Sequence, residues 1–453
     1  MRCCFNVCVA MLLRCVIKNL YSFREETEFN LFPSSRAIRL LHHKVKCDEV
    51  EAMRLTAIYG ANGAGKTNLV KALLDLKGIV TVGNISRVVF QNYKFQFSKN
   101  SQNEPVSIAI EFYHGGKVYY YSLEMDTGII SYESLSVSKK NKDILVFERK
   151  TNGTQTIKFG NSDNRDRANN LFYDVIQNKL LGREVLLLSF MATNYPEENT
   201  DILNAYNWII KKLFVLNSEY LKDLTLAYYF DNNPGMRNLL QDVLTGTKTG
   251  IESVSVSSTV MEEEQLAPDM VKQLKDSPGV PLVIPSKVDY RIRNTVVYQN
   301  GQILFQEIQP NHRMPDGTIV KMPINYESDG TIRLIEYIPL IYLVLTMDCV
   351  VIIDEIERSL HPILIKEIIS KLSESHSAKG QLIFTTHESC LLDQDILRPD
   401  EIWFAQKDSD QATHFYPLSD FNIHRTANIE NGYLNGRYGG IPFLANLNDL
   451  HWQ

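Results

Sequence analysis

The sequence has few cysteines, and no two of them stand in a CxxC spacing. It contains seven in 453 residues, and four of these lie within the first fifteen positions. The odd total, with only Cys47, Cys349 and Cys390 at isolated positions, argues against a disulfide framework, and the missing CxxC pairs argue against a zinc site built on them. The pattern is typical of reduced thiols, so we expect the protein to be cytoplasmic.

The sequence also lacks an excess of positive charge. It has 47 Lys and Arg against 53 Asp and Glu, which gives a formal net charge of -6. A protein that coats nucleic acid is therefore disfavoured, although a local basic patch would not show in this average. Whether the protein binds DNA directly stays open at this stage.

No apolar run is long and uninterrupted enough to predict a membrane span. The longest stretch, Leu334 to Ile353, contains Glu336, Pro339 and Asp348. It predicts a buried helix followed by a buried strand. We therefore expect no membrane association.

The N-terminus carries a short apolar run, from Cys3 to Leu13, without the features of a signal peptide. Asn6 interrupts the run, Arg14 follows it, and no small-x-small cleavage site is present. Translation from Met1 and translation from Met11 both fit this sequence, and they remain alternatives.

The order of local patterns indicates an α/β protein with an antiparallel β subdomain and a helical insertion. Residues 1–97 contain an apolar strand, a glycine-rich turn and a helical pattern, and residues 98–162 alternate as antiparallel strands do. Residues 163–285 are predicted to be mostly helical, and residues 286–453 alternate between helix and strand. No segment sustains the heptads of a long coiled coil.

One segment fits the phosphate-loop pattern GxxxxGK[ST] at all eight positions: Gly60, Ala61, Asn62, Gly63, Ala64, Gly65, Lys66 and Thr67. An apolar strand precedes it and a helical pattern follows. Glycines let backbone N–H groups converge on phosphates, and the helix adds the positive end of its dipole. We predict that Lys66 reaches the β- and γ-phosphates of ATP and that the Thr67 hydroxyl binds Mg²⁺.

A second motif is an apolar strand, Cys349 to Ile353, that ends in the acid pair Asp354 and Glu355. Carboxylates at the end of a buried strand lie where ligands bind in open α/β sheets. Asp354 is predicted to hold Mg²⁺, and Glu355 to orient and deprotonate the attacking water. The alternative is that both acids cap the following helix.

Three further segments make the chain resemble ABC-type ATPases of the RecF, SMC and OLD kind. Glu327 to Thr331 resembles their shortened signature motif, Ser359 to Pro362 resembles their D-loop, and Phe384 to His387 resembles their switch histidine motif. The segments Leu12 to Phe29 and Gly432 to Leu444 look like the AAA15/AAA21 group found in prokaryotic anti-phage systems. Asp329 departs from longer ABC signatures, which carry glycine there.

This resemblance implies an ABC-like P-loop head, assembled from both ends of the chain. Ser328 and Gly330 of one copy would face the ATP held by another, in a homodimer or larger assembly. His387 would contact the γ-phosphate or the attacking water, and Gln91 would contact Mg²⁺, with Gln96 as the alternative. The alternatives are that Ser328 is a helix N-cap, His387 an ordinary strand-end histidine and His361 a helix-start residue.

The resemblance also implies a function: a Mg²⁺-dependent ATPase that senses a phage component and controls a separate toxic effector. PARIS-like systems, which pair such an ATPase with a TOPRIM-type nuclease, look closest. The stretch after His387 is too short for a nuclease domain, so a nuclease is expected on a partner chain. The alternatives are a RecF-like DNA-repair ATPase and a nucleotide-dependent scaffold with slow turnover.

Overall fold

A computed structural model describes residues 9–88, 90–139, 142–160, 172–217, 225–247, 249–286, 293–424 and 427–441, with the exception of the Gln91 side chain. Of the two alternative start residues, Met11 is the first residue of the first strand, and Met1 lies outside the described residues. The chain forms two compact units. Unit 1 comprises Met1–Val215, Thr346–Ile356 and Ile369–Gln453, and unit 2 comprises Leu216–Leu345 and Glu357–Ile368.

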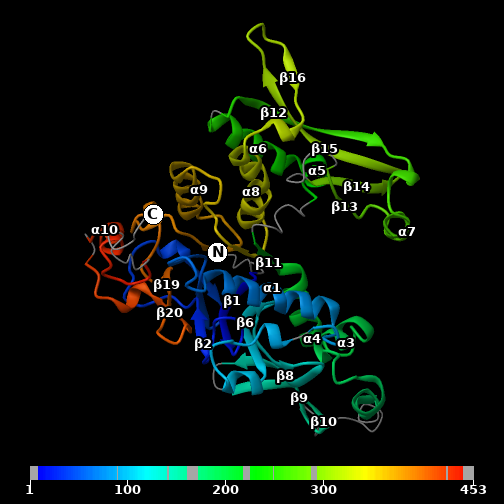
Figure 1. Cartoon of the computed structure of the whole chain (residues 1–453), viewed down its shortest axis with the longest axis vertical. Coiled ribbons are helices and arrows are strands. Elements are labelled where there is room, and N and C mark those ends of the chain that lie inside the picture. The colour runs from blue at the N-terminus through cyan, green and yellow to red at the C-terminus, as the bar shows by residue number, and fades with distance from the viewer. Residues whose placement is uncertain are drawn as a thin grey trace, which may run out of the picture. The chain divides into compact units, whose positions relative to one another are not determined.

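The helices and strands of both units are labelled in Figure 1. The strands are β1 (Met11–Lys18), β2 (Thr27–Asn30), β3 (Lys44–Cys47), β4 (Val50–Met53), β5 (Leu55–Gly60), β6 (Val106–His114), β7 (Lys117–Asp126), β8 (Ile129–Lys139), β9 (Lys142–Asn152), β10 (Thr154–Phe159), β11 (Leu213–Leu216), β12 (Ile251–Val260), β13 (Leu282–Pro285), β14 (Arg293–Gln299), β15 (Gln302–Arg313), β16 (Ile319–Lys321), β17 (Val350–Ile353), β18 (Gln381–Thr385), β19 (Ile402–Lys407) and β20 (Thr413–Pro417).

The α-helices are α1 (Lys66–Val82), α3 (Leu187–Asn194), α4 (Thr200–Asn207), α5 (Leu226–Asn232), α6 (Pro234–Gly246), α7 (Pro268–Asp276), α8 (Asp329–Thr346), α9 (Pro362–Glu374) and α10 (Ile429–Leu434). Short 3-10 or π turns include η2 (Phe90–Asn92) and η10 (Ser389–Leu391). None of the described helices has the length and apolar character needed to cross a membrane.

Unit 1 contains the sheet that positions the site. Its order is β11-β17-β18-β5-β19-β20, and β17, β18, β5 and β19 run parallel. Every residue of β5, β17 and β18 is buried, as expected for parallel strands covered on both faces. The α/β class predicted from the sequence is confirmed.

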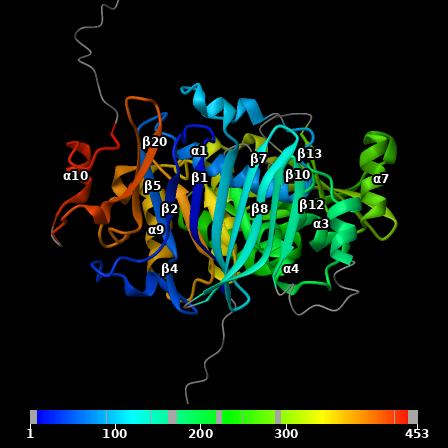
Figure 2. The ribbon, with the colours of Figure 1, turned by 90° about the horizontal axis from the view of Figure 1, so that it is seen from below.

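A second sheet of unit 1 is antiparallel, in the order β10-β9-β8-β7-β6-β1-β2. Figure 2 shows β1, β2, β7 and β8 of this sheet side by side. One hydrophobic core joins its inner face to α1 and to the parallel sheet, with Leu73 of α1, Phe112 of β6 and Ile352 of β17 among its members. The nucleotide-binding helix predicted after the phosphate loop is thus held between two sheets.

Gln381, the first residue of β18, links the two sheets through its side chain. Its Oε1 accepts from Leu12 N at 2.8 Å, and its Nε2 donates to Leu12 O at 3.0 Å and to Met53 O at 2.7 Å. The side chain is fully buried, so each of these bonds lies in a low-dielectric environment. Gln381 therefore holds β1 beside the start of the parallel sheet.

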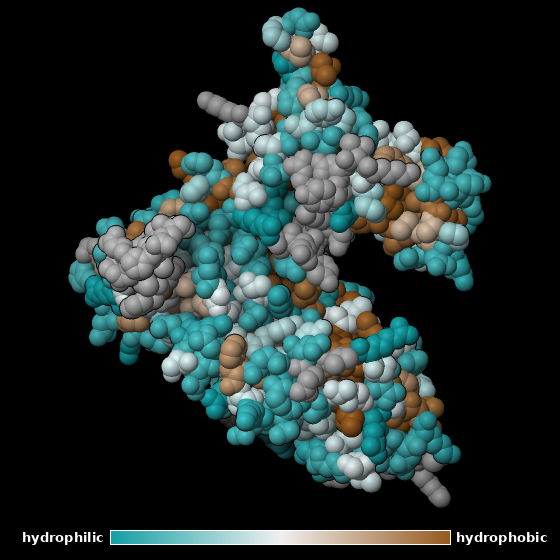
Figure 3. Space-filling view, viewed as in Figure 1, coloured by the Kyte–Doolittle hydropathy of each residue, from teal (hydrophilic) through white to brown (hydrophobic). Residues whose placement is uncertain are grey.

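Unit 2 is built on the antiparallel sheet β12-β15-β14-β13, with β16 paired to the end of β15. Residues 163–285 are helical only in part, because Ile251–Val260 forms the strand β12. The predicted ranges 163–285 and 286–453 each contain residues of both units. The face seen in Figure 3 is mainly hydrophilic, with scattered hydrophobic patches.

The apolar stretch from Leu334 to Ile353 is a helix followed by a buried strand, α8 and then β17, as predicted. Pro339 lies inside α8. Glu336 is buried in the same helix and pairs with Arg333 at 3.2 Å. This pair explains how a carboxylate is accommodated within an otherwise apolar helix.

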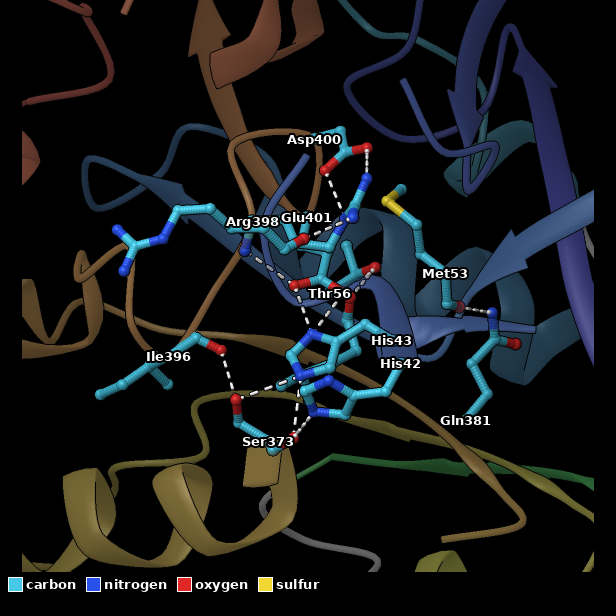
Figure 4. Close-up of polar contacts among 12 residues, drawn as sticks. His42, His43, Met53, Thr56, Ser373, Gln381, Ile396, Arg398, Asp400 and Glu401 are labelled. Carbon is cyan, nitrogen blue, oxygen red and sulfur yellow. Dashed lines mark hydrogen bonds and ion pairs between the residues drawn. The ribbon is translucent and has the colours of Figure 1, made fainter. Parts of the chain in front are cut away.

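A buried polar network lies at the N-terminal ends of the parallel strands, away from the phosphate loop (Figure 4). His43 Nδ1 is 2.9 Å from Glu401 Oε1, and His43 Nε2 is 2.9 Å from Ser373 O. Arg398 donates to both carboxylate oxygens of Asp400, and its backbone N–H donates to Glu401 Oε2 at 2.9 Å. Burial raises the pKa of Glu401, and His43 opposes that rise. The network ties three distant segments to one edge of the sheet.

Replacing Glu401 by Ala is expected to lower the free energy of unfolding by about 3–5 kcal/mol, because His43 and the Arg398 N–H lose a buried acceptor. The exposed Glu197 provides a matched control. Its replacement by Ala should change stability by no more than about 0.5 kcal/mol. Urea denaturation of both variants measures the difference, and equal midpoints would show that the network contributes little.

Candidate active site

A cavity of about 270 Å³ lies at the C-terminal end of β5 in unit 1. It is lined by Asn62, Gly63, Ala64, Gly65, Lys66, Thr67, Asn68, Glu355 and His387. The phosphate loop, the second acid and the switch histidine therefore share one cavity, as the sequence motifs predict. Ligands of open α/β sheets bind at this edge of the parallel strands.

The phosphate loop depends on glycine at positions that no other residue fits well. Gly63 and Gly65 have φ values of 76° and 107°, in the left-handed region. A Cβ on Gly65 would lie 2.1 Å from Thr413 Oγ1 and 2.9 Å from Ser22 Oγ. On Gly60, a Cβ would lie 2.6 Å from the Ala405 carbonyl oxygen. The loop is thus packed closely against neighbouring backbone and hydroxyl groups, with its own backbone free to face the cavity.

Two hydroxyl residues that sequence motifs did not identify support this loop. Thr413 Oγ1 lies 2.7 Å from Ser22 Oγ and 2.9 Å from Ala64 O. Asn68 Nδ2 donates to Ser22 Oγ at 2.7 Å. Ser22 and Thr413 are both buried, and they come from the β1–β2 connection and from β20. No local sequence signal marks either of them.

Replacing Gly65 by Ala is expected to lower the free energy of unfolding by about 2–5 kcal/mol, since it combines a strained φ with a clash against Thr413. Gly63→Ala is the matched control, because its φ is also positive but no atom lies within 4 Å of the new Cβ. That variant should lose only about 1–2 kcal/mol. Thermal or urea denaturation that gave equal losses for both variants would contradict the close packing of Gly65.

Lys66 is buried, and its ammonium group occupies the turn of the loop. Its Nζ donates to Gly60 O at 2.7 Å and to Ala61 O at 3.3 Å, and it lies 3.1 Å from His387 Nε2. An ammonium group can only donate, so this contact requires His387 Nε2 to accept and places the ring proton on Nδ1. The contact joins two predicted site residues that are far apart in the sequence.

The acid pair follows β17 directly, and a threonine of β18 holds it. Thr385 Oγ1 donates to Asp354 Oδ1 at 2.6 Å and accepts from the Glu355 backbone N–H at 2.8 Å. Glu355 has a φ of 52°, an uncommon conformation for a residue other than glycine. Thr385 is fully buried. Thr385 belongs to the Phe384–His387 motif, and this position in the motif is the sequence feature from which its role could have been predicted.

The alternative that the acids cap the next helix does not fit, because α9 begins only at Pro362. His361 holds that position instead, and its Nδ1 accepts from Ile363 N at 3.2 Å. His361 is thus a helix-start residue. Asp354 and Glu355 lie before this turn, at the end of the parallel strand.

The oxygen donors at this site fit Mg²⁺ in kind. Thr67 lines the cavity and carries a hydroxyl group, whereas Asp354, whose carboxylate is 6% exposed, directly precedes Glu355 but is not among the residues that line the cavity. Among the described residues, no group of three or more His, Cys, Asp or Glu side chains is arranged so that it could hold a metal ion. Mg²⁺ needs no such cluster when phosphates and water complete its shell. Gln91 lies in η2 with its side chain outside the described atoms, and Gln96 is not part of the cavity lining.

The signature-like motif belongs to unit 2. Ser328 Oγ accepts from Thr331 N at 3.2 Å at the start of α8, so the predicted N-cap is present as local structure. A Cβ on Gly330 would lie 2.9 Å from the Ser359 carbonyl oxygen, which explains the glycine. Glu327 is held by His312 at 2.7 Å. A role of Ser328 and Gly330 toward a nucleotide remains a prediction.

The parallel sheet, the phosphate loop and the acid pair together define a P-loop nucleotide-binding domain. Residues 55–173 and 261–393, more than half of the chain, match the family described as "AAA domain, putative AbiEii toxin, Type IV TA system". The chain belongs to this AAA_21 family and carries an ATPase domain of the AAA type. The matched segments contain the phosphate loop, the acid pair and His387. No curated protein matches the chain.

Solved structures similar to this chain include three SMC heads. The SmcHead bound to the C-winged helix domain of ScpA is 14% identical, with 90% of this chain and 97% of that chain covered and a TM-score of 0.42. The SMC head domain from Thermotoga maritima is 11% identical, with 91% and 99% covered and a TM-score of 0.37. The Pyrococcus furiosus Smc head with an extended coiled coil, bound to the C-terminal domain of ScpA, is 13% identical, with 90% and 96% covered and a TM-score of 0.41.

Proposed function

We propose that this protein hydrolyses ATP to ADP and phosphate with Mg²⁺, and that the bound nucleotide controls its assembly. The observation that carries this proposal is the shared cavity, which holds a phosphate loop, a carboxylate and a histidine. The ammonium group of Lys66 lies within this loop, where it donates to the Gly60 carbonyl oxygen. These are the groups that phosphoryl transfer to water requires.

Each residue has a defined task in this reaction. The loop N–H groups and Lys66 bind and orient the phosphates, and His387 hydrogen-bonds the γ-phosphate or the attacking water. Glu355 takes a proton from that water while the water oxygen bonds to the γ-phosphorus. At the same time the bond between the γ-phosphorus and the bridging oxygen of ADP breaks. Thr67 and Asp354 would hold Mg²⁺, which offsets the negative charge of the phosphates.

The partners that we propose rest on the resemblance of the sequence to ABC-like ATPases. We propose that the protein forms a homodimer or larger assembly in which Ser328 and Gly330 of one copy face the ATP of another. The N-terminus of α8 offers backbone N–H groups for this purpose. The assembly would control a separate effector, such as a TOPRIM-type nuclease, in response to a phage-encoded trigger. The family is described by a putative toxin of a type IV toxin–antitoxin system, and this description supports a role in defence.

Mass photometry of the purified chain tests the assembly directly. We expect larger particles with a non-hydrolysable ATP analogue and Mg²⁺ than with ADP or without nucleotide. Lys66→Ala is the matched control, and it should give one particle size under all three conditions. A wild-type chain that remains monomeric with the analogue would remove nucleotide-controlled self-assembly from the proposal.

A further inference from the structure

The glycine- and tyrosine-rich segment near the C-terminus packs onto the core of unit 1. We call residues Ala427 to Ile441 the tail. Tyr433 and Tyr438 are 6% and 2% exposed, and the ring of Tyr433 stacks on Phe404 at 5.6 Å. Tyr433 also meets Tyr59 edge-to-face at 5.7 Å. Because Tyr59 precedes Gly60 in β5, the tail lies against the strand that leads into the phosphate loop.

The glycines of the tail are explained by this packing. A Cβ on Gly432 would lie 2.6 Å from the ring of Tyr438. Gly439 has a φ of 69°, and a Cβ there would lie 2.5 Å from the Tyr416 hydroxyl. The unusual composition therefore encodes a compact fold of the tail on unit 1.

The tail and its neighbour Tyr59 hold the backbone that follows His387. Ser389 Oγ donates to Glu430 Oε1 of α10 at 2.7 Å. The hydroxyl of Tyr59, whose ring contacts Tyr433, donates to Glu388 O at 3.2 Å. Further along, Gln394 Nε2 donates to Ala427 O at 3.0 Å. Three contacts thus connect the tail, directly or through Tyr59, to the segment from Glu388 to Gln394.

His387 depends on this segment for its position. The residue is exposed and lines the cavity. Its Nε2 lies 3.1 Å from Lys66 Nζ, and the course of the backbone on either side of His387 determines from where the ring makes this contact. A displacement of about 1 Å at a reacting group can cost roughly 100-fold in rate.

We infer that Glu430 is a positioning residue for His387, and that the tail thereby sets the rate of ATP hydrolysis. This inference rests on the proposed hydrolysis at the cavity. It assigns a role to the tail that neither the phosphate loop nor the acid pair explains.

The test compares Glu430→Ala with Glu430→Gln and Leu434→Ala in the full chain. The Gln variant keeps an oxygen that can accept from Ser389, and Leu434 is an exposed residue of the same helix. We expect Glu430→Ala to lower kcat about 10-fold with an unchanged KM for ATP. The two controls should stay within about 2-fold of wild type. In a His387→Ala background, Glu430→Ala should have no further effect on kcat.

A second readout does not depend on hydrolysis. In protein labelled with ¹³C-histidine, Glu430→Ala should shift the ring resonance of His387, and the two controls should leave it in place. Wild-type kcat and an unmoved His387 resonance in Glu430→Ala would overturn the inference. So would an equal loss of kcat with and without His387. A wild-type chain that releases no phosphate would refute the proposed function, while the resonance would still decide the positioning role.

Discussion

Replacing Glu355 by Gln is expected to slow ATP hydrolysis by about 100- to 10,000-fold and to leave ATP binding intact. The amide has nearly the same shape as the carboxylate but cannot take a proton from water. The Glu355 backbone N–H still donates to Thr385 Oγ1, so the uncommon conformation at this position is retained. The variant should therefore hold ATP in an otherwise unchanged cavity and accumulate the ATP-bound assembly.

Glu367→Gln is the matched control for this experiment. Glu367 is an exposed residue of α9, and it does not line the cavity. Its replacement should leave the rate of phosphate release unchanged. If Glu355→Gln hydrolysed ATP as fast as this control, the base would have to be another group, and His387 is the only other titratable side chain besides Lys66 among the residues that line the cavity.

Replacing Lys66 by Ala is expected to weaken ATP binding by about 10- to 100-fold and to abolish productive hydrolysis. A hydrogen bond to a charged group contributes about 1.5–3 kcal/mol, and each 1.4 kcal/mol corresponds to a factor of about ten. The substitution also removes the donor that the Gly60 and Ala61 carbonyls share. The loop should therefore become less ordered even before nucleotide binds.

Lys71→Ala separates the role of this ammonium group from a general loss of positive charge. Lys71 lies on the same helix, is exposed, and does not line the cavity. Isothermal titration with ATP and Mg²⁺ should give wild-type affinity for Lys71→Ala and a much weaker affinity for Lys66→Ala. Equal affinities in the two variants would mean that the phosphate loop does not bind the phosphates as proposed.

The phosphate loop and the acid pair could be located from sequence because their information is local. The glycine spacing from Gly60 to Gly65 encodes the turn, and the apolar residues before Asp354 encode a buried parallel strand. Long-range contacts carry no such signal. Thr413 and Ser22 reach the site only through long-range packing, and neither has distinctive neighbours in the sequence, whereas Thr385 stands within the Phe384–His387 motif.

The division into units was harder to predict for the same reason. The sheet of unit 2 pairs Ile251–Val260 with Gln302–Arg313, across a helix and two other strands. Ile251–Val260 lies in the range that the sequence predicts to be mostly helical, and neither strand indicates its partner. The tail shows the opposite case, because its glycines and tyrosines distinguish it in the sequence, and the structure shows Tyr433 and Tyr438 packed on unit 1.

The most direct test of this proposal is the rate at which the purified wild-type chain releases phosphate from ATP, with Mg²⁺ and with excess EDTA. We predict release with Mg²⁺ that falls to background with EDTA, and background release from Lys66→Ala and Glu355→Gln under both conditions. Release by Lys66→Ala or by Glu355→Gln at the wild-type rate would contradict hydrolysis at this cavity. The complete absence of release from a folded wild-type assembly that binds ATP would show that the nucleotide serves only to hold the protein together.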